Sequence, residues 1–189
     1  MDDDALTLER RDGLPDALRV LVTALPRGTW EAHPGFSPLT RFWLQRHLTF
    51  REILSRLKAG TDDYLNGDTD PRRYGHETAR LARIFVQELH GHHTIEDQHY
   101  FPILQTLDGR LESGFALLDA DHDALDGHLV ALADATDAMR AGLGSDDPLS
   151  PAAMLGRHLD GFDRYLNRHL TDEEDLVVPV ILTYAPEIG

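Results

Sequence analysis

The chain has 189 residues, enough for one domain with a substantial core, and its 18 basic and 33 acidic residues give a formal net charge of -15. Nucleic acid and anionic membrane surfaces would repel such a chain, so neither is expected as a partner. The absence of cysteine excludes disulfides, cysteine-ligated zinc and iron–sulfur clusters. The acidic N-terminus resembles no secretory signal and no segment could span a bilayer, so we expect a soluble, cytoplasmic protein.

Clusters of Gly, Asp and Pro divide the chain into helical segments. A short helix is predicted over 14–25, within an N-terminal extension that covers 1–37. Turn signals then delimit four long helices, at roughly 38–65, 71–105, 111–141 and 151–176. No strand pattern competes with them. The sequence therefore predicts an all-α protein, an up-down-up-down four-helix bundle over 38–189 preceded by the extension.

Each long helix carries apolar residues at spacings of three and four, the pattern of a buried stripe, and each stripe contains histidine. The first and third stripes include His47 and His122, and the fourth includes His169 and Glu173. The second is predicted to comprise Leu81, Phe85, Glu88, His92, Glu96, His99 and Ile103. His99 is expected to be a hydrogen-bonded core residue, and His93 is expected at the surface.

The polar residues of these stripes point to a metal. A buried carboxylate without a partner costs several kcal/mol, and the chain would bury two of them beside imidazoles. His92 and Glu96, like His169 and Glu173, stand four residues apart and can reach the same point of the bundle interior. A bound cation would offset the cost of burial.

The stretch HHTIEDQHYFP at 92–102 returns as HLTDEEDLVVP at 169–179, 77 residues later, and His47 precedes His122 by 75 residues. Two helical hairpins of one design, related by a pseudo-twofold axis, are therefore predicted. Four imidazoles and two carboxylates exceed what one tetrahedral metal uses, and they suit two metals. Nitrogen and oxygen donors without sulfur favour iron or manganese over structural zinc.

At these residues the sequence resembles the hemerythrin-like family, also called HHE cation-binding domains, over nearly all of 38–183. HHTIEDQHYFPIL and HLTDEEDLVVPVIL carry the resemblance. It implies a four-helix bundle around a non-haem centre of two iron ions, for which manganese or zinc could substitute, that binds O2 or senses iron, oxygen or redox state. Position by position, the ligands that it implies are His47, His92, Glu96, His122, His169 and Glu173.

Two positions depart from the pattern of the oxygen carriers in that family. Those proteins have a second His four residues after the third-helix His, and Asp126 stands there in this chain. Either Asp126 is a metal ligand, or water or an exogenous ligand takes its place. The carriers also place the fourth-helix carboxylate at the position of Glu174, whereas the repeat and the stripe favour Glu173. A rotated second helix would present His93 with Asp97 in place of His92 with Glu96.

Three functions are compatible with these residues. The favoured one is a binding or sensing module for O2 or a related small ligand, acting through an unidentified protein partner or as a scavenger or store. The second is an enzyme that reduces peroxide, O2 or nitric oxide, with Tyr165 or Trp43 as a redox-active neighbour. The third is a metal-free helical interaction module.

Overall fold

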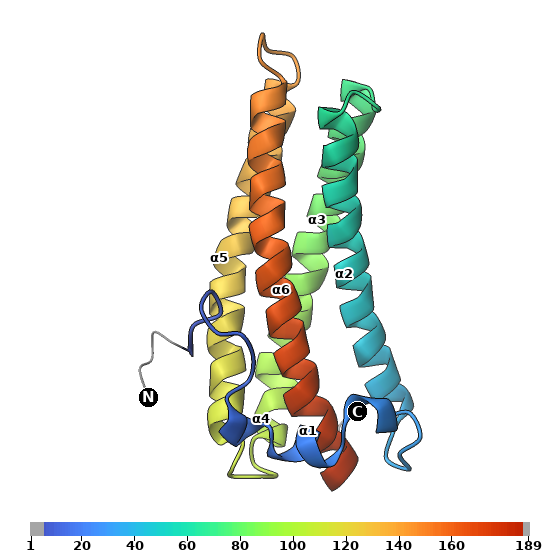
Figure 1. The fold of residues 1–189 in the computed structure, drawn as a ribbon, viewed down its shortest axis with the longest axis vertical. Helices are drawn as coiled ribbons and strands as arrows, with labels where there is room; N and C mark the ends of the chain where they lie inside the picture. Colours follow the sequence, from blue (N-terminus) through green and yellow to red (C-terminus); the bar gives the residue numbers. More distant parts are fainter. Residues whose placement is uncertain (1–5, 187–189) are drawn as a thin grey trace. The chain divides into compact units, whose positions relative to one another are not determined.

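The computed structural model describes residues 6–186, and every regular element among them is helical. Four long helices pack as a bundle after a short N-terminal helix (Figure 1): α2 (Pro38–Leu65), α3 (Pro71–Ile95), α5 (Glu112–Gly142) and α6 (Leu149–Tyr184). Before them come η2 (Asp16–Leu18), α1 (Val20–Ala24) and η3 (Arg27–Thr29). The predicted fold class is therefore confirmed.

Two of the long helices begin with the same local device. The hydroxyl oxygen of Ser37 accepts a hydrogen bond from the Thr40 N–H (3.1 Å), and Pro38 follows it as the first residue of α2. Asp70 accepts from two N–H groups in the first turn of α3, with Pro71 in the first position. In both cases a side chain satisfies N–H groups that the helix itself leaves free, and proline occupies a place where no N–H is needed.

The end of the second helix differs most from its prediction. In place of one helix over 71–105, α3 stops at Ile95, a π-helical turn η4 (Glu96–Tyr100) follows, and α4 (Phe101–Leu104) completes the segment. Pro102, which cannot donate a backbone hydrogen bond, lies just after that turn. The repeat-related Pro179 has no such effect, because α6 continues through it to Tyr184.

The chain forms two compact units, and each contains parts of all four long helices. Unit 1 comprises the described residues up to Leu48, His92–Ala124 and those from Asn167 on; unit 2 comprises Thr49–Gly91 and Leu125–Leu166. Unit 1 thus combines the start of α2 with the end of α3, and the start of α5 with the end of α6. Successive long helices therefore run in opposite directions.

The core of unit 2 is apolar and aromatic. Phe85 meets Phe50 and Phe162 edge to face, with ring centroids 6.4 and 5.5 Å apart. Tyr64 stacks on Tyr74 at 4.3 Å where α2 turns into α3. Such aromatic pairs contribute about 0.5–1.5 kcal/mol each beyond their burial.

The core of unit 1 includes the N-terminal segment. Leu14, Leu18 and Trp30 are buried against residues of α4, α5 and α6 such as Phe115 and Leu176. The boundary at residue 37 between an extension and a domain stays a prediction. Buried residues of the described part of the extension belong to this core. No described helix is both long and apolar enough to cross a bilayer.

Candidate metal centre

Seven side chains of unit 1 gather nitrogen and oxygen atoms between the four helices. Every long helix contributes: His47 from α2, His92 and His93 from the last turn of α3, Glu96 from the start of η4, His122 from α5, and His169 and Glu173 from α6. Six of the seven are buried, and the side chain of His92 is 9% exposed.

The first group of donors comprises His47, His92, Glu96 and Glu173, with one ligand atom from each lying within 4.8 Å of the others. The Nε2 atoms of His47 and His92 are 3.0 Å apart. The Nε2 atom of His92 lies 3.1 Å from Oε1 of Glu96, and that of His47 lies 3.4 Å from Oε2 of Glu173. Two imidazoles and two carboxylates therefore face one point.

The second group comprises three imidazoles, those of His93, His122 and His169, again within 4.8 Å of one another. The rings of His93 and His122 stack with centroids 4.0 Å apart, and the ring of His169 meets that of His122 edge-on at 4.8 Å. Three converging imidazole nitrogens are a common ligand set for a transition metal.

The two carboxylates lie between the groups. Glu173 Oε2 is 3.4 Å from Nε2 of His47 in the first group and 3.4 Å from Nε2 of His169 in the second. Glu96 places Oε1 at 3.1 Å from His92 Nε2 and Oε2 at 3.9 Å from His122 Nε2. Each glutamate can thus serve both groups, as a carboxylate that bridges two metal ions does.

Many polar atoms of this cluster are buried with no hydrogen-bond partner. They are both ring nitrogens of His93, both carboxylate oxygens of Glu173, Glu96 Oε2, His122 Nε2 and His169 Nε2. An unsatisfied buried polar group costs about 1–3 kcal/mol, and native proteins keep few of them. Since each of these residues offers a ligand atom to one of the two groups of donors, the set fits bound cations.

Burial also sets the protonation of the metal-free cluster. It lowers the pKa of His92 to about 2 and, despite a hydrogen bond to Asp121, that of His169 to about 4. Burial, and then the neighbouring charge of Glu96, raise the pKa of Glu173 well above its usual range. At neutral pH the imidazoles of His92 and His169 are therefore neutral and able to bind a cation, which would displace a proton from Glu173.

The second acid in each repeat holds a histidine of the other hairpin. Asp97 Oδ1 lies 2.7 Å from Nδ1 of His122, and Glu174 Oε1 lies 3.0 Å from Nδ1 of His47. A carboxylate that accepts a hydrogen bond from Nδ1–H favours the tautomer in which Nε2 is unprotonated, with its lone pair directed at the cluster. The acids at 97 and 174 therefore orient imidazoles.

His169 has its own acceptor, Asp121, whose Oδ2 lies 3.2 Å from its Nδ1. Burial alone would raise the pKa of Asp121, but the hydrogen bonds and charges of Arg11 and His169 together outweigh it, so the pKa lies below its usual value. The acceptor of His169 is therefore an ionised carboxylate.

Trp43 orients Glu96, because its indole N–H donates to Glu96 Oε1. Its ring packs on that of His47, with centroids 4.5 Å apart. We expect Trp43→Phe to weaken metal binding about tenfold, since it keeps the packing and removes the donor. Competition with a chromogenic chelator measures this. Trp30→Phe is the control, because that indole donates to the Leu25 carbonyl oxygen; equal losses in both variants would refute a role for the Trp43 N–H.

His93 is the member of the cluster that the sequence prediction placed at the surface. The predicted stripe of the second helix took Glu88 where the structure buries Leu89, and the buried series Phe85, Leu89, His93 leads to Glu96. Reading that stripe through Leu89 would have found His93. His92 and His93 both belong to the cluster, so the structure includes His93 without replacing His92 and Glu96.

The predictions for His99 and Ile103 were wrong, since both are exposed. The π-helical turn η4 is the reason. Its wider backbone pairing, from Phe101 N–H to Glu96 O, places one more residue in the turn and brings Phe101 and Leu104 into the core instead.

Comparison with known proteins adds a decisive observation. Residues 39–181 match the family described as hemerythrin HHE cation binding domain. The chain belongs to this family. No curated protein and no solved structure matches it significantly. The buried histidine and glutamate clusters thus lie in a hemerythrin HHE domain, and a metal cofactor is consistent with both observations.

Asp126 is the predicted site residue that this HHE domain does not bring to the cluster. It lies in unit 2 with its side chain 47% exposed, and its Oδ1 atom is 3.1 Å from Nδ1 of His90. It belongs to neither group of donors. The geometry therefore counts against the expectation that Asp126 ligates, and His93 supplies a nitrogen that the sequence analysis did not include.

The choice between Glu173 and Glu174 has a structural answer. Both oxygens of Glu173 are buried without a hydrogen-bond partner, and its Oε2 lies 3.4 Å from Nε2 of His47 and of His169. Glu174 instead contacts Nδ1 of His47 with one oxygen and Arg27 with the other. The geometry favours Glu173 as a ligand and Glu174 as the group that orients His47. Tyr165, one turn before His169 on α6, packs on His128 in unit 2, with centroids 4.9 Å apart.

Proposed function

We propose that the chain binds two iron ions and uses them to bind or sense O2, or a related small oxidant. The observation that carries this proposal is the pair of carboxylates, with unsatisfied buried oxygens, between two groups of imidazoles. His47 and His92 would hold one ion, and His93, His122 and His169 the other. Glu96 and Glu173 would be shared between them.

The donor chemistry favours iron. Five imidazoles and two carboxylates, without sulfur, exceed a tetrahedral zinc site and suit two ions of higher coordination number. Manganese or zinc could occupy the same residues as substitutes. Bound iron would supply the change between the ferrous and ferric states and a coordination position for a small ligand. Asp97, Glu174 and Asp121 would hold the imidazoles in place.

A small cavity beside the cluster suits a diatomic ligand. Its volume is about 20 Å3, and its walls include Trp43, Glu96 and Tyr100 together with aliphatic side chains such as Leu39 and Ile181. That is room for about one small molecule, and the apolar walls offer too few polar partners for an ordered water. O2 or nitric oxide fits such a space better than an organic substrate does.

The same cavity supports the second candidate, an enzyme that reduces peroxide, O2 or nitric oxide. Two oxidisable side chains, Trp43 and Tyr100, line it next to Glu96. They could pass electrons to the centre, a role that the sequence analysis gave to Trp43 or Tyr165. Peroxide turnover well above that of free iron, lost in His92→Ala, would favour the enzyme. A stable adduct with O2 and no turnover would favour the sensor or carrier.

Elemental analysis of protein made in iron-replete medium tests the proposal. We expect close to two irons per chain, with near-ultraviolet absorption that changes on reduction and returns in air. His47→Ala should lower the iron content, whereas His158→Ala, which changes a histidine of unit 2 that contacts the His128 carbonyl oxygen, should not. Wild-type protein that takes up no iron would leave the metal-free interaction module as the better reading.

A further inference from the structure

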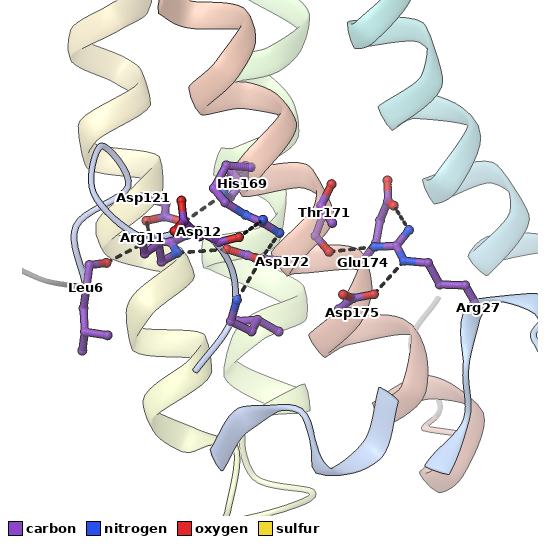
Figure 2. Close-up of polar contacts among 12 residues, drawn as sticks. Leu6, Arg11, Asp12, Arg27, Asp121, His169, Thr171, Asp172, Glu174 and Asp175 are labelled. Carbon is purple, nitrogen blue, oxygen red and sulfur yellow. Dashed lines mark hydrogen bonds and ion pairs between the residues drawn. The ribbon is translucent and has the colours of Figure 1, made fainter. Parts of the chain in front are cut away.

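The N-terminal segment brings two arginines to the carboxylates that surround the cluster. We propose that residues 6–37, called the strap below, position two histidines of the metal centre through Arg11 and Arg27. The inference rests on the proposed function and deepens it, because it assigns the strap to the same site. Figure 2 shows the contacts: Arg11 lies beside Asp121, which contacts His169, and Arg27 lies beside Glu174.

The first chain of contacts runs from Arg11 to His169. Arg11 binds both oxygens of Asp121, with Nη1 2.6 Å from Oδ1, and Asp121 Oδ2 accepts from His169 Nδ1 at 3.2 Å. The side chains of Arg11 and Asp121 are each 3% exposed. A two-point contact between a planar guanidinium and a carboxylate fixes the plane of that carboxylate, and with it the direction of the acceptor.

The second chain of contacts runs from Arg27 to His47 and has the same design. Arg27 binds Glu174 through Oε2, and the other oxygen, Oε1, lies 3.0 Å from His47 Nδ1. Arg27 is also fixed to α6 at 2.7 Å from Asp175 and 2.8 Å from the Thr171 carbonyl oxygen. In both chains the arginine and the imidazole share one carboxylate.

The strap is attached to the bundle well enough to serve this purpose. Arg11 also contacts Asp172 at 2.9 Å, and the Leu14 N–H donates to the same carboxylate at 3.1 Å. Leu18 reaches the helix α5 at Gly114, where an added Cβ would stand 3.4 Å from Leu18 Cδ2. Backbone, charge and apolar contacts together hold the strap, and with it the two arginines, against α5 and α6.

These contacts act on the ring nitrogens that would bind metal. When Asp121 or Glu174 accepts from Nδ1, the Nε2 atom of His169 or His47 carries a lone pair, and both Nε2 atoms face Glu173 at 3.4 Å. A carboxylate that is free to rotate would let the ring adopt its other tautomer, with Nε2 protonated and unable to bind a metal. The strap therefore prepares the two histidines before the metal arrives.

The third histidine with a carboxylate acceptor provides an internal comparison. His122 is held by Asp97 of η4, at 2.7 Å, and no strap residue takes part in that contact. Substitutions in the strap should thus affect His169 or His47 and leave His122 unchanged. A general loss of stability would not be selective in this way.

The experiment uses the full-length chain with Arg11→Gln, Arg11→Lys, Arg27→Gln and, as a matched control, Arg19→Gln, which removes the charge of an exposed strap arginine. The histidine tautomers of the metal-free protein are read from long-range 1H–15N NMR spectra. The release of Co2+ to excess EDTA is then measured, with Co2+ as the metal probe and its visible bands as the signature of ligand geometry. Melting temperatures of the metal-free variants show which of them remain folded.

We expect Arg11→Gln to give mixed tautomers for His169 only, and to release Co2+ about tenfold faster with unchanged stoichiometry. Arg27→Gln should do the same for His47, with a smaller effect on release because the Arg27 side chain is 42% exposed. Arg11→Lys should behave between Arg11→Gln and wild type in both measurements, and Arg19→Gln should match wild type.

Wild-type tautomers and release rates in folded Arg11→Gln and Arg27→Gln would overturn the proposal and leave the strap as a cover. If Arg11→Gln fails to fold, the tautomers and release rates of Arg27→Gln and Arg11→Lys still test whether the strap positions the two histidines. Should the wild-type protein bind neither iron nor Co2+, the proposed function fails, and the tautomers of the metal-free protein still test the strap.

Discussion

Replacing His93 with leucine should lower the iron content of the protein from two ions per chain to one. His93 offers two buried nitrogens without partners, and it belongs to the group whose other members are His122 and His169. The variant leaves that group with two imidazoles, and Glu96 lies closer to the first group, 3.1 Å from His92 Nε2 against 3.9 Å from His122 Nε2. We therefore expect the group of His122 and His169 to lose its ion while the first group keeps its own. The end point of a Co2+ titration and elemental analysis measure the loss.

Leucine is the substitution that the chain itself suggests. Leu170, which is buried, holds the position equivalent to His93 in the second repeat. It fills a similar volume without a donor, so the core should remain packed. Asp126→Ala and His90→Ala are the controls, and both should keep two irons, since these residues pair with each other in unit 2. Two irons in His93→Leu, or one in Asp126→Ala, would refute this ligand assignment.

Glu173→Gln should have opposite effects on the metal-free and the metal-bound protein. Without metal, the buried Glu173 must take up a proton when the chain folds at neutral pH, and glutamine avoids that cost, so the variant is expected to be more stable by about 1–3 kcal/mol. With metal, the variant lacks a shared ligand, and added iron should no longer raise the melting temperature. Urea unfolding of the metal-free protein measures the first effect, and melting temperatures with and without iron measure the second.

The pH dependence of the stability of the metal-free protein is a second test of the role of Glu173. Burial raises the pKa of Glu173, so above the unfolded pKa of about 4.5 the folded state keeps a proton that the unfolded state has lost. The stability contributed by this group is therefore present below pH 4.5 and lost as the pH rises through the folded pKa. The slope is at most about 1.4 kcal/mol per pH unit, and it should be absent in Glu173→Gln.

Glu52→Gln is the matched control, because it makes the same change on an exposed carboxylate of α2. It should alter neither the stability of the metal-free protein nor the effect of iron. A Glu173→Gln variant that is destabilised without metal, or that still responds to iron as wild type does, would show that this carboxylate has a structural role instead.

The repeat and the hydrophobic periodicity predicted most of the fold and six of the seven clustered residues. The stripes of α2, α5 and α6 consist of buried aliphatic and aromatic residues together with His47, His122, His169 and Glu173. A single buried face on each helix therefore accounted for both the apolar residues and the site residues. These stripes are long and regular, which is the case in which periodicity is most informative.

The prediction failed where the two repeats differ. His93 has an aliphatic counterpart in Leu170, so the repeat argued against it. The predicted second stripe included Glu88 in place of its neighbour Leu89, which the structure buries. It then continued with a regular helical period through the π-helical turn η4, whose backbone pairing no sequence period describes. Irregular turns of this kind often accompany functional sites.

The role of the N-terminal segment could not be predicted from the sequence. Arg11 and Arg27 stand in stretches without regular periodicity, and their partners at Asp121, Asp172 and Glu174 are 110, 161 and 147 residues away in the chain. Such contacts depend on the tertiary fold alone.

The crossed pairing of acids and histidines has a consequence for the history of the fold. Asp97, in the first hairpin, holds His122 of the second, and Glu174, in the second, holds His47 of the first. A hairpin alone would therefore lack the carboxylate that orients its imidazole, and its own second acid would lack the imidazole that it contacts. Two copies of one ancestral hairpin, associated about a twofold axis, would make both contacts at once. Duplication and fusion would then have converted an intermolecular dependence into an intramolecular one, after which each half could diverge, as Leu170 has from His93.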